Sequence, residues 1–370
     1  MATRNELERR RDEVLRVCER PGTAEELFRD LLLRLRRLVP FTGSLCFGLD
    51  PATHLATAPA LIDGVHASHC GSFWPREFLV EDTNLFLAMA RTQTAAAGLV
   101  EATGARPVRS ARYREFMAPQ GYGDELRAVL RAERSAWGSI SLYRPTEERP
   151  FSPDEIAFVA GLTRPVAEAL RARLVAERRS TGAQPHSPGV VLFDGSGNLL
   201  NANDAARAWF DELPDVGIGA EVPSPVRVLL AHGLAVAEGH ERGPARMRLR
   251  TGRGRWLVLH ASHLPGAAGT DDLLAVVVEP ATSAEVAPII VEAYALTPRE
   301  QDIISALARG LGTAEMAQQL FLSAHTVRDH VKSVFAKLGV STRGELVAKL
   351  FAEHYEPALE QRVTRMPLEA

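Results

Sequence analysis

Side chains that can recognise another molecule gather near the C-terminal end of the chain. Arg328 and Lys332 carry positive charge, Asp329 carries negative charge, and His330 can donate or accept a hydrogen bond. Apolar residues recur through the same stretch at steps of four, three and four, at Val327, Val331, Val334 and Leu338. This spacing predicts one helix with an apolar inner face and a polar outer face. A helix of this kind fits the major groove of DNA.

Three short helices are expected to hold these side chains in place. The first begins at Thr297, which forms a capping box with Glu300. Gly310 separates it from a second, shorter helix. Ser323 is the expected cap of the third helix, which ends before Gly339. The side chains expected on the outer face of the third helix are His325, Asp329, Lys332 and Ser333.

A series of motifs at fixed offsets runs through this region. They are Leu296-Thr297-Pro298-Arg299-Glu300, Gly310, Glu315-x-Ala317, Leu320, Ser323, Thr326-Val327-Arg328-x-His330, Lys337-Leu338 and Arg343. Together they resemble the LuxR-type, or GerE-type, helix-turn-helix domain over residues 297–353. The resemblance implies a four-helix unit whose third helix reads the major groove and whose fourth helix pairs two subunits. The chain departs from the family pattern at Gly312-Thr313-Ala314, where many members have Ser-Asn-Lys, so one expected phosphate contact is absent.

The resemblance also implies roles for single residues. Arg328, Asp329 and Lys332 stand where family members contact bases, and Thr326 and Lys337 stand near phosphates. Asp329 is unusual at a reading position, where it could accept from a cytosine amino group, and packing remains an alternative role for His330. The complete expected DNA-binding set is Ser323, Thr326, Val327, Arg328, Asp329, His330, Lys332 and Lys337. The residues expected to pair two subunits are Leu346, Val347 and Leu350.

Composition describes an ordinary globular chain with no global attraction for nucleic acid. The 370 residues are 46% apolar and 24% charged, with a net charge of −3, and this length predicts two or three domains. Residues 297–353 hold seven Lys and Arg against six Asp and Glu, a net charge of only +1. A domain with so little charge is expected to bind DNA tightly only as a dimer. Three cysteines, no membrane-length apolar run and an acidic start predict a cytoplasmic protein without disulfides.

The N-terminal half predicts a sensory domain over residues 1–180. Helices are expected at 4–20, 23–38 and 152–178, and strands at 44–49, 125–131 and 136–143, with mixed signals between 55 and 120. Gly138-x-Ile140-x-Leu142 followed by Phe151-Ser-Pro-Asp-Glu155-Ile156 resembles a GAF sensor domain. The resemblance implies that the first and last helices pack between subunits, although ordinary core packing explains the same apolar stripe.

After a linker at 181–188, a second sensory domain is expected over residues 189–282. An apolar strand, an Asp194-Gly195 turn, a second strand and Asn203 before a helix at 204–210 resemble the opening of a PAS domain. Later strands are expected at 245–250, 255–264 and 273–279, and the Pro/Gly-rich stretch 213–244 predicts a reduced helical part. A connector (283–295), the helix-turn-helix domain (296–356) and a flexible tail (357–370) complete the predicted organisation.

Candidate metal and cofactor sites are weak. His66, His69 and Cys70 could bind a metal if a fourth ligand arrived from elsewhere, but a polar surface turn with a buried thiol is favoured, because no second cluster supplies partners. Cys46 lies on an expected strand, where a packed thiol competes with a redox sensor. His260 and His263 have opposite parity, so at most one could face a PAS pocket. No phosphate-binding Gly-rich loop occurs, and no cofactor is predicted.

The sequence therefore predicts a multidomain α+β protein: a GAF-like α/β/α sensor, a small PAS-like antiparallel sheet domain and an all-α four-helix helix-turn-helix domain. The expected function is sequence-specific DNA binding that regulates transcription and is controlled by the two sensors. Expected partners are double-stranded DNA, a second copy of the chain and an unknown small-molecule or protein signal, with RNA polymerase as a candidate and no membrane. Two alternatives are a protein-interaction adaptor with weak DNA binding and a metal-dependent hydrolase at His66, His69 and Cys70.

Overall fold

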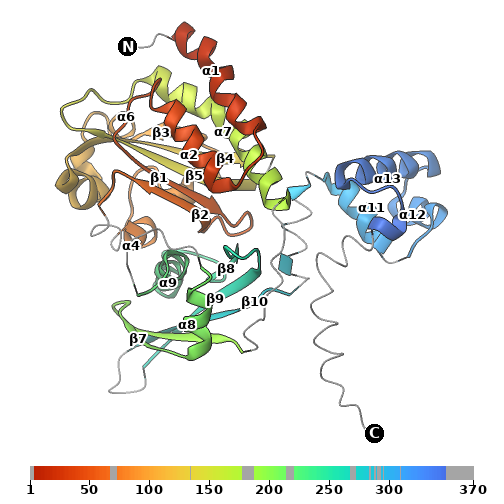
Figure 1. Ribbon diagram of the computed structural model, residues 1–370. Helices are drawn as coiled ribbons and strands as arrows, with labels where there is room; N and C mark the ends of the chain where they lie inside the picture. Colours follow the sequence, from red (N-terminus) through yellow and green to blue (C-terminus); the bar gives the residue numbers. More distant parts are fainter. Residues whose placement is uncertain are drawn as a thin grey trace. The chain divides into compact units, whose positions relative to one another are not determined.

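Two compact units make up the chain, residues 1–280 and residues 281–370. The computed structural model shown in Figure 1 describes residues 4–66, 73–133, 135–176, 187–213, 221–266, 272–282, 296–308 and 310–346, with a few positions between 283 and 295. Most of the linker predicted at 181–188 and the whole tail predicted at 357–370 lie outside the described residues.

The first unit begins with helices that cover one face of a sheet. α1 (Arg4–Glu19) packs against the long helix α7 (Pro153–Ala176), which lies on β4 and β5, and α2 (Ala24–Leu35) lies against β2. Thr23 caps α2 in a capping box, because its hydroxyl accepts from the Glu26 N–H and the Glu26 carboxylate accepts from the Thr23 N–H. The α2 side chains that enter the core are Leu27, Phe28, Leu31, Leu32 and Leu35.

The first sheet has five antiparallel strands in the order β2-β1-β5-β4-β3. Their bounds are Gly43–Leu49 for β1, Ala56–Asp63 for β2, Ala96–Gly98 for β3, Tyr122–Ala132 for β4 and Ser135–Pro145 for β5. Short helical segments lie between β2 and β4: α4 (Phe73–Phe78), α5 (Phe86–Thr92), α6 (Leu99–Ala102), η1 (Pro107–Arg109), the π-helical turn η2 (Tyr113–Met117) and η3 (Ala118–Gln120). Aromatic side chains join these segments to the sheet, because Phe73 packs edge-on against both Trp74 and Phe116, and Trp74 packs against Phe47.

The second sheet repeats the connectivity of the first, with the order β7-β6-β10-β9-β8. Its strands are Gly189–Asp194 (β6), Leu199–Ala202 (β7), Arg246–Arg250 (β8), Trp256–Leu264 (β9) and Leu273–Pro280 (β10). α8 (Asp204–Phe210) follows β7 and is capped by Asn203, whose side chain accepts from the Ala206 N–H, as the predicted hairpin and helix require.

The helix α9 (Ser224–Ala237) corrects the prediction that the helical part of this region is reduced. Its prolines lie at the start, where a missing backbone N–H leaves no helical hydrogen bond unmade. Gly233 allows α9 to lie close on β9, since a Cβ at this position would come 3.0 Å from the Ala261 Cβ. Composition alone suggested a reduced helical part because proline and glycine are also the residues of turns.

A buried ion pair ties the two sheets into one unit. Asp50 follows β1 and is 1% exposed, and Arg248 lies on β8. The Arg248 backbone N–H and Nε donate to Asp50 Oδ2 at 2.8 and 3.2 Å, and Nη2 donates to Oδ1 at 2.7 Å. α4 also packs on α9, and one hydrophobic cluster runs through both sheets. Residues 43–145 and 189–280 therefore share one core.

The second unit holds three helices in its described part: α11 (Pro298–Ala308), α12 (Thr313–Leu320) and α13 (Ala324–Leu338). Residues 343–346 are also helical, at the place where the fourth helix was predicted. The multidomain α+β class is confirmed, with two antiparallel sheets carrying helices and a C-terminal helical domain.

Candidate DNA-binding surface

The third helix, α13, is seated on the domain core by the apolar residues that the spacing predicted. Val327 and Val334 are 0% exposed and Leu338 is 1% exposed, and Val331 and Phe335 pack beside them. Ile303 and Leu307 of α11 and Met316 of α12 complete the cluster. Because this face is buried, the opposite face of α13 is the one presented to solvent.

Both ends of α13 are fixed by local hydrogen bonds. Ser323 caps the N-terminus, where its hydroxyl accepts from the Thr326 N–H at 3.1 Å, and the two hydroxyls lie 2.8 Å apart. At the other end Gly339 adopts the left-handed conformation with φ 62° and its N–H bonds back into the last turn. The two predicted boundaries of the helix are therefore confirmed.

The outer face of α13 carries the charged groups expected at a base-reading surface. Arg328, Asp329 and Lys332 are all exposed, and Arg328 Nε donates to the Ala324 carbonyl at 3.2 Å. His325 and Asp329 are one turn apart, with His325 Nε2 3.6 Å from Asp329 Oδ2. His330 is half-buried, so a packing role and a DNA-contacting role both remain consistent with its position.

Glu300 of α11 binds two side chains of α13, those of Ser333 and Lys337, which were not expected to contact it. Its Oε1 accepts from the Ser333 hydroxyl and its Oε2 from Lys337 Nζ, both at 2.6 Å. The prediction that Ser333 points outward is therefore corrected, because its hydroxyl is turned toward the buried carboxylate. Lys337, which is expected near a phosphate, is paired with the same carboxylate. Burial opposes the charge of Glu300, but hydrogen bonds from Lys337, Ser333 and Thr297 outweigh it and lower its pKa to about 2.

Arg343 has a bracing role that its motif did not reveal. Its Nη2 donates to the Leu307 carbonyl at 2.6 Å and its Nη1 to the Leu311 carbonyl at 3.1 Å. These carbonyls flank Gly310, which has a φ of 95°. Arg343 therefore closes the C-terminal end of α11, where helix carbonyls lack partners of their own. In the sequence, Arg343 was identified only as one residue that matches the family pattern.

Two predicted site residues are buried in the domain itself. Val327, placed in the DNA-binding set, is 0% exposed and supports the helix from beneath, so it makes no contact with a groove. Leu346, placed in the subunit-pairing set, is 1% exposed within the same core, which argues against a role for its side chain between subunits. Val347 and Leu350 lie outside the described residues.

The weaker candidate sites gain no support. His66 is exposed and its backbone N–H bonds to Gln120, while His69 and Cys70 lie outside the described residues. Among the residues that the structure describes, no three metal-ligating side chains come together. Cys46 is 0% exposed, and burial raises the pKa of its thiol far above the ordinary value.

Both strand histidines lie beside carboxylates. His260 Nε2 is 3.8 Å from Glu279 Oε1, and His263 Nε2 is 3.1 Å from Asp272 Oδ2. Within the described part of the chain, no helix is long and apolar enough to cross a membrane.

A short capped helix, a tight turn and a second capped helix with a polar outer face define a helix-turn-helix domain. The family model for bacterial regulatory proteins of the luxR family matches residues 294–350. The spore germination protein GerE of Bacillus subtilis is 40% identical over 55 residues, which are 15% of this chain and 74% of that protein. The chain belongs to the luxR family of bacterial regulatory proteins.

Other relatives match the same part of the chain. The uncharacterized transcriptional regulatory protein YhcZ of B. subtilis is 44% identical over 62 residues, covering 17% of this chain and 28% of that protein. A putative HTH-type transcriptional regulator of Mycobacterium tuberculosis is 42% identical over 52 residues, which are 14% of this chain and only 6% of that protein. The chain therefore spans a small fraction of the length of the mycobacterial relatives.

Solved structures match more weakly. The GAF domain/HD domain protein from Geobacter sulfurreducens has a TM-score of 0.32 and 18% identity, covering 42% of this chain and 98% of that chain. Escherichia coli SdiA has a TM-score of 0.31 and 14% identity, covering 93% and 96% of the two chains. Because both TM-scores are low, the fold of residues 1–280 is described by its own strand order and not by these structures.

Proposed function

We propose that the chain is a transcriptional regulator that binds DNA in a sequence-specific manner through α13. The observation that carries this proposal is the division of α13 into a fully buried apolar face and an exposed face with Arg328, Asp329 and Lys332. Arg328 and Lys332 supply donors for guanine edges or phosphates, and Asp329 supplies an acceptor for a cytosine amino group. The likeness to GerE and YhcZ supports the same function.

The regulator acts as a homodimer in this proposal. A single domain carries few cations, so two copies are needed to share the phosphate contacts over two half-sites. Two reading helices must then lie about 34 Å apart, one turn of the duplex. Residues 1–280 form one unit with a shared core and control when the two domains take up this spacing.

The direct test replaces Arg328 with alanine. We expect Arg328→Ala to weaken binding to the selected operator by about 1–3 kcal/mol and to relax base preference at one position of each half-site. Arg299→Ala is the matched control, because Arg299 is an exposed arginine on α11 that pairs with Asp302. Titrations of the full chain against DNA selected from random sequences measure both. Equal binding curves for Arg328→Ala and the unchanged chain would refute the assignment.

Salt dependence separates this function from the adaptor alternative. A dimer that neutralises several phosphates loses affinity steeply as salt rises, with a slope of roughly 0.9 per phosphate in a plot of log affinity against log salt. A protein-interaction adaptor with incidental DNA contact would give weak binding without base preference. Selection of bound sequences with and without cell extract would also show whether a signal changes affinity or half-site spacing.

A further inference from the structure

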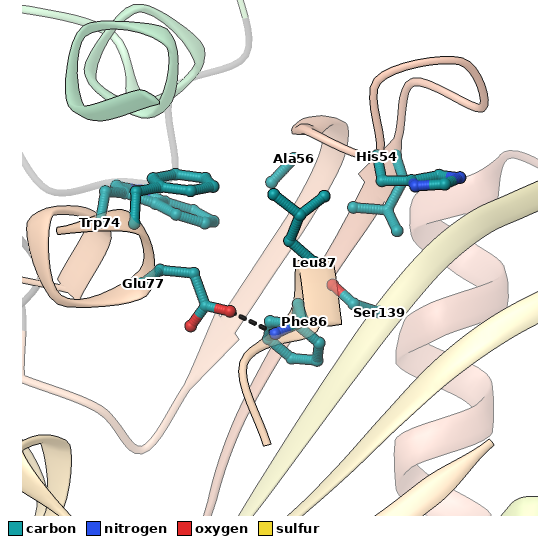
Figure 2. Close-up of a pocket in the computed structure, with 9 residues that line it drawn as sticks. His54, Ala56, Trp74, Glu77, Phe86, Leu87 and Ser139 are labelled. Atoms are coloured by element: carbon teal, nitrogen blue, oxygen red, sulfur yellow. Dashed lines mark hydrogen bonds between the residues drawn. The ribbon is translucent and has the colours of Figure 1, made fainter. Parts of the chain in front are cut away.

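The space between α4, α5 and the first sheet is too small for a signal molecule. Trp74, Phe86 and Leu87 form part of its wall (Figure 2), and the Glu77 carboxylate on its edge already accepts from the Phe86 N–H. The cavity volume is about 10 Å³, which is room for about one water molecule. This space is therefore not a ligand site.

A pair of side chains that can respond to solution conditions lies on the exposed face of α13. His325 Nε2 is 3.6 Å from Asp329 Oδ2, and the two side chains are 81% and 66% exposed. Histidine is the side chain that ordinarily gains or loses a proton between about pH 5 and 8. The two partners therefore attract each other as opposite charges only when the imidazole is protonated.

Helix stability is a poor explanation for this pair. His325 is the second residue of α13, and the first turn of a helix carries a partial positive charge that opposes a cation. Exposed pairs contribute little to stability, and pairs four residues apart contribute most when the acid is on the N-terminal side. In α13 the acid is on the C-terminal side. The pair is therefore better explained by a molecule that binds to this face.

The charged neighbours of His325 belong to α13 itself. Arg328 follows one turn later, and its Nε donates to the Ala324 carbonyl at 3.2 Å, which keeps the guanidinium near the first turn. His330 is half-buried and points to a different side of the helix. The charged residues described in α11 and α12 pair with each other, bind α13 elsewhere or cap a helix: Arg299, Asp302, Glu300 and Glu315. In the free chain, Arg328 therefore opposes a proton on His325 and Asp329 favours it.

Bound DNA would change this balance. Ser323 and Thr326, on either side of His325 in the sequence, belong to the expected DNA-binding set, so a phosphate approaches this turn in the complex that we propose. A protonated imidazole has two N–H donors, whereas a neutral one has a single donor. Nε2 can then donate to Asp329 while Nδ1 donates to the phosphate, and the charge of the phosphate favours the protonated ring.

We propose that His325 takes up a proton from solvent when α13 binds its operator, and that the protonated ring bridges the Asp329 carboxylate and a DNA phosphate. The bridge makes Asp329, which alone would repel the DNA backbone, part of a contact that attracts it. This inference rests on the proposed function, since it concerns the same DNA complex. Because the bound state holds the proton more tightly, the gain in affinity is complete at low pH and is lost as the pH rises through about 6 to 8.

Titrations of the full chain with a fluorescently labelled duplex from the random-sequence selection test the proposal. They are made at about pH 6 and about pH 8.5, on the two sides of the histidine range, at one ionic strength. An opposite charge a few ångströms away shifts a protonation equilibrium by about tenfold or more, so the unchanged chain should lose about tenfold in affinity per half-site at the higher pH. His325→Gln should lose most of this pH response and bind like the unchanged chain at the higher pH. His325→Lys, which is charged at both pH values, should bind tightly at both.

His240→Gln is the matched control, because His240 is also an exposed histidine beside a carboxylate, with its Nε2 3.4 Å from Glu238 Oε2, but it lies in the first unit. It should keep the full pH response. Melting curves establish that each variant is folded. An equal pH response in the unchanged and His325→Gln chains, or the same loss of affinity for His325→Lys at the higher pH, would overturn the proposal and leave operator binding itself established. Absence of any sequence preference at both pH values would instead refute the proposed function.

Discussion

Replacing Glu300 with glutamine should loosen α13 from α11, because this carboxylate accepts two hydrogen bonds from the reading helix and a third from the start of its own helix. Lys337 and Ser333 donate from α13, and the Thr297 N–H donates at 2.7 Å from the start of α11. The Glu300 side chain is 5% exposed and Lys337 is 33% exposed. Glutamine keeps the shape of the side chain and removes its charge, so the change isolates the electrostatic contribution.

The size of the effect follows from the pKa of Glu300. Its pKa falls from the ordinary value of 4.5 to about 2 in the folded chain, and this difference corresponds to about 3 kcal/mol. Screening at the partly exposed Lys337 reduces this to about 2–3 kcal/mol. Since the folded pKa is the lower one, the stabilisation is complete above about pH 5 and is lost as the pH falls toward 2.

Hydrogen–deuterium exchange of the α13 amides in the intact chain measures this contribution. We expect Glu300→Gln to speed exchange by about 30- to 150-fold at pH 7, the ratio that corresponds to 2–3 kcal/mol. Glu315→Gln is the control, because Glu315 caps α12 through Gly312 and is exposed. A ratio below about threefold for Glu300→Gln, or a difference that persists undiminished in urea unfolding near pH 2, would refute the reasoning.

Two further predictions concern the first unit. Asp50→Asn should remove the negative charge that Asp50 presents to the buried Arg248, costing about 3 kcal/mol, and should split the calorimetric unfolding of residues 1–280 into two transitions. Asp63→Asn is the control, because Asp63 forms an exposed pair with Arg36, and it should leave one transition. A single, unshifted transition for Asp50→Asn would contradict the role of the Asp50–Arg248 pair. Cys46 should resist alkylation in the folded chain up to pH 9 and react only after denaturation, because its thiol is buried and has a raised pKa. Site-resolved mass spectrometry measures the labelling, and rapid labelling of Cys46 in the folded chain would support a redox role instead.

The elements that could be predicted from the sequence are those whose boundaries are set by neighbouring residues. Ser323 and Gly339 bound α13 through bonds within one turn, and Asn203 begins α8 in the same way. Between residues 55 and 120 the supporting contacts are distant in sequence. Arg76 pairs with Glu115, and β3 is three residues long and exists because it pairs with β4. No local pattern encodes such partners.

The same distinction applies to the candidate site. The capping role of Glu300 was predicted because Thr297 is three residues away, whereas its bonds to Ser333 and Lys337 join residues 33 and 37 positions apart. Helical periodicity placed Ser333 on the outer face because it gives only the direction of each side chain around the helix axis. It contains no information about the Glu300 carboxylate, which comes from another helix. Arg328, Asp329 and Lys332, which the family resemblance placed at base-contacting positions, are all exposed.

The pairing of Lys337 with Glu300 changes how DNA binding must be achieved. A lysine held at 2.6 Å by a buried carboxylate contributes little positive charge to the surface, so the outer face of α13 relies on Arg328 and Lys332. Two cations against the exposed Asp329 give a single domain a weak hold on phosphates. In the homodimer that we propose, affinity comes from two copies at a fixed spacing, because the second contact follows the first at high effective concentration. A change in packing within residues 1–280 that alters this spacing would remove the gain without touching any DNA contact.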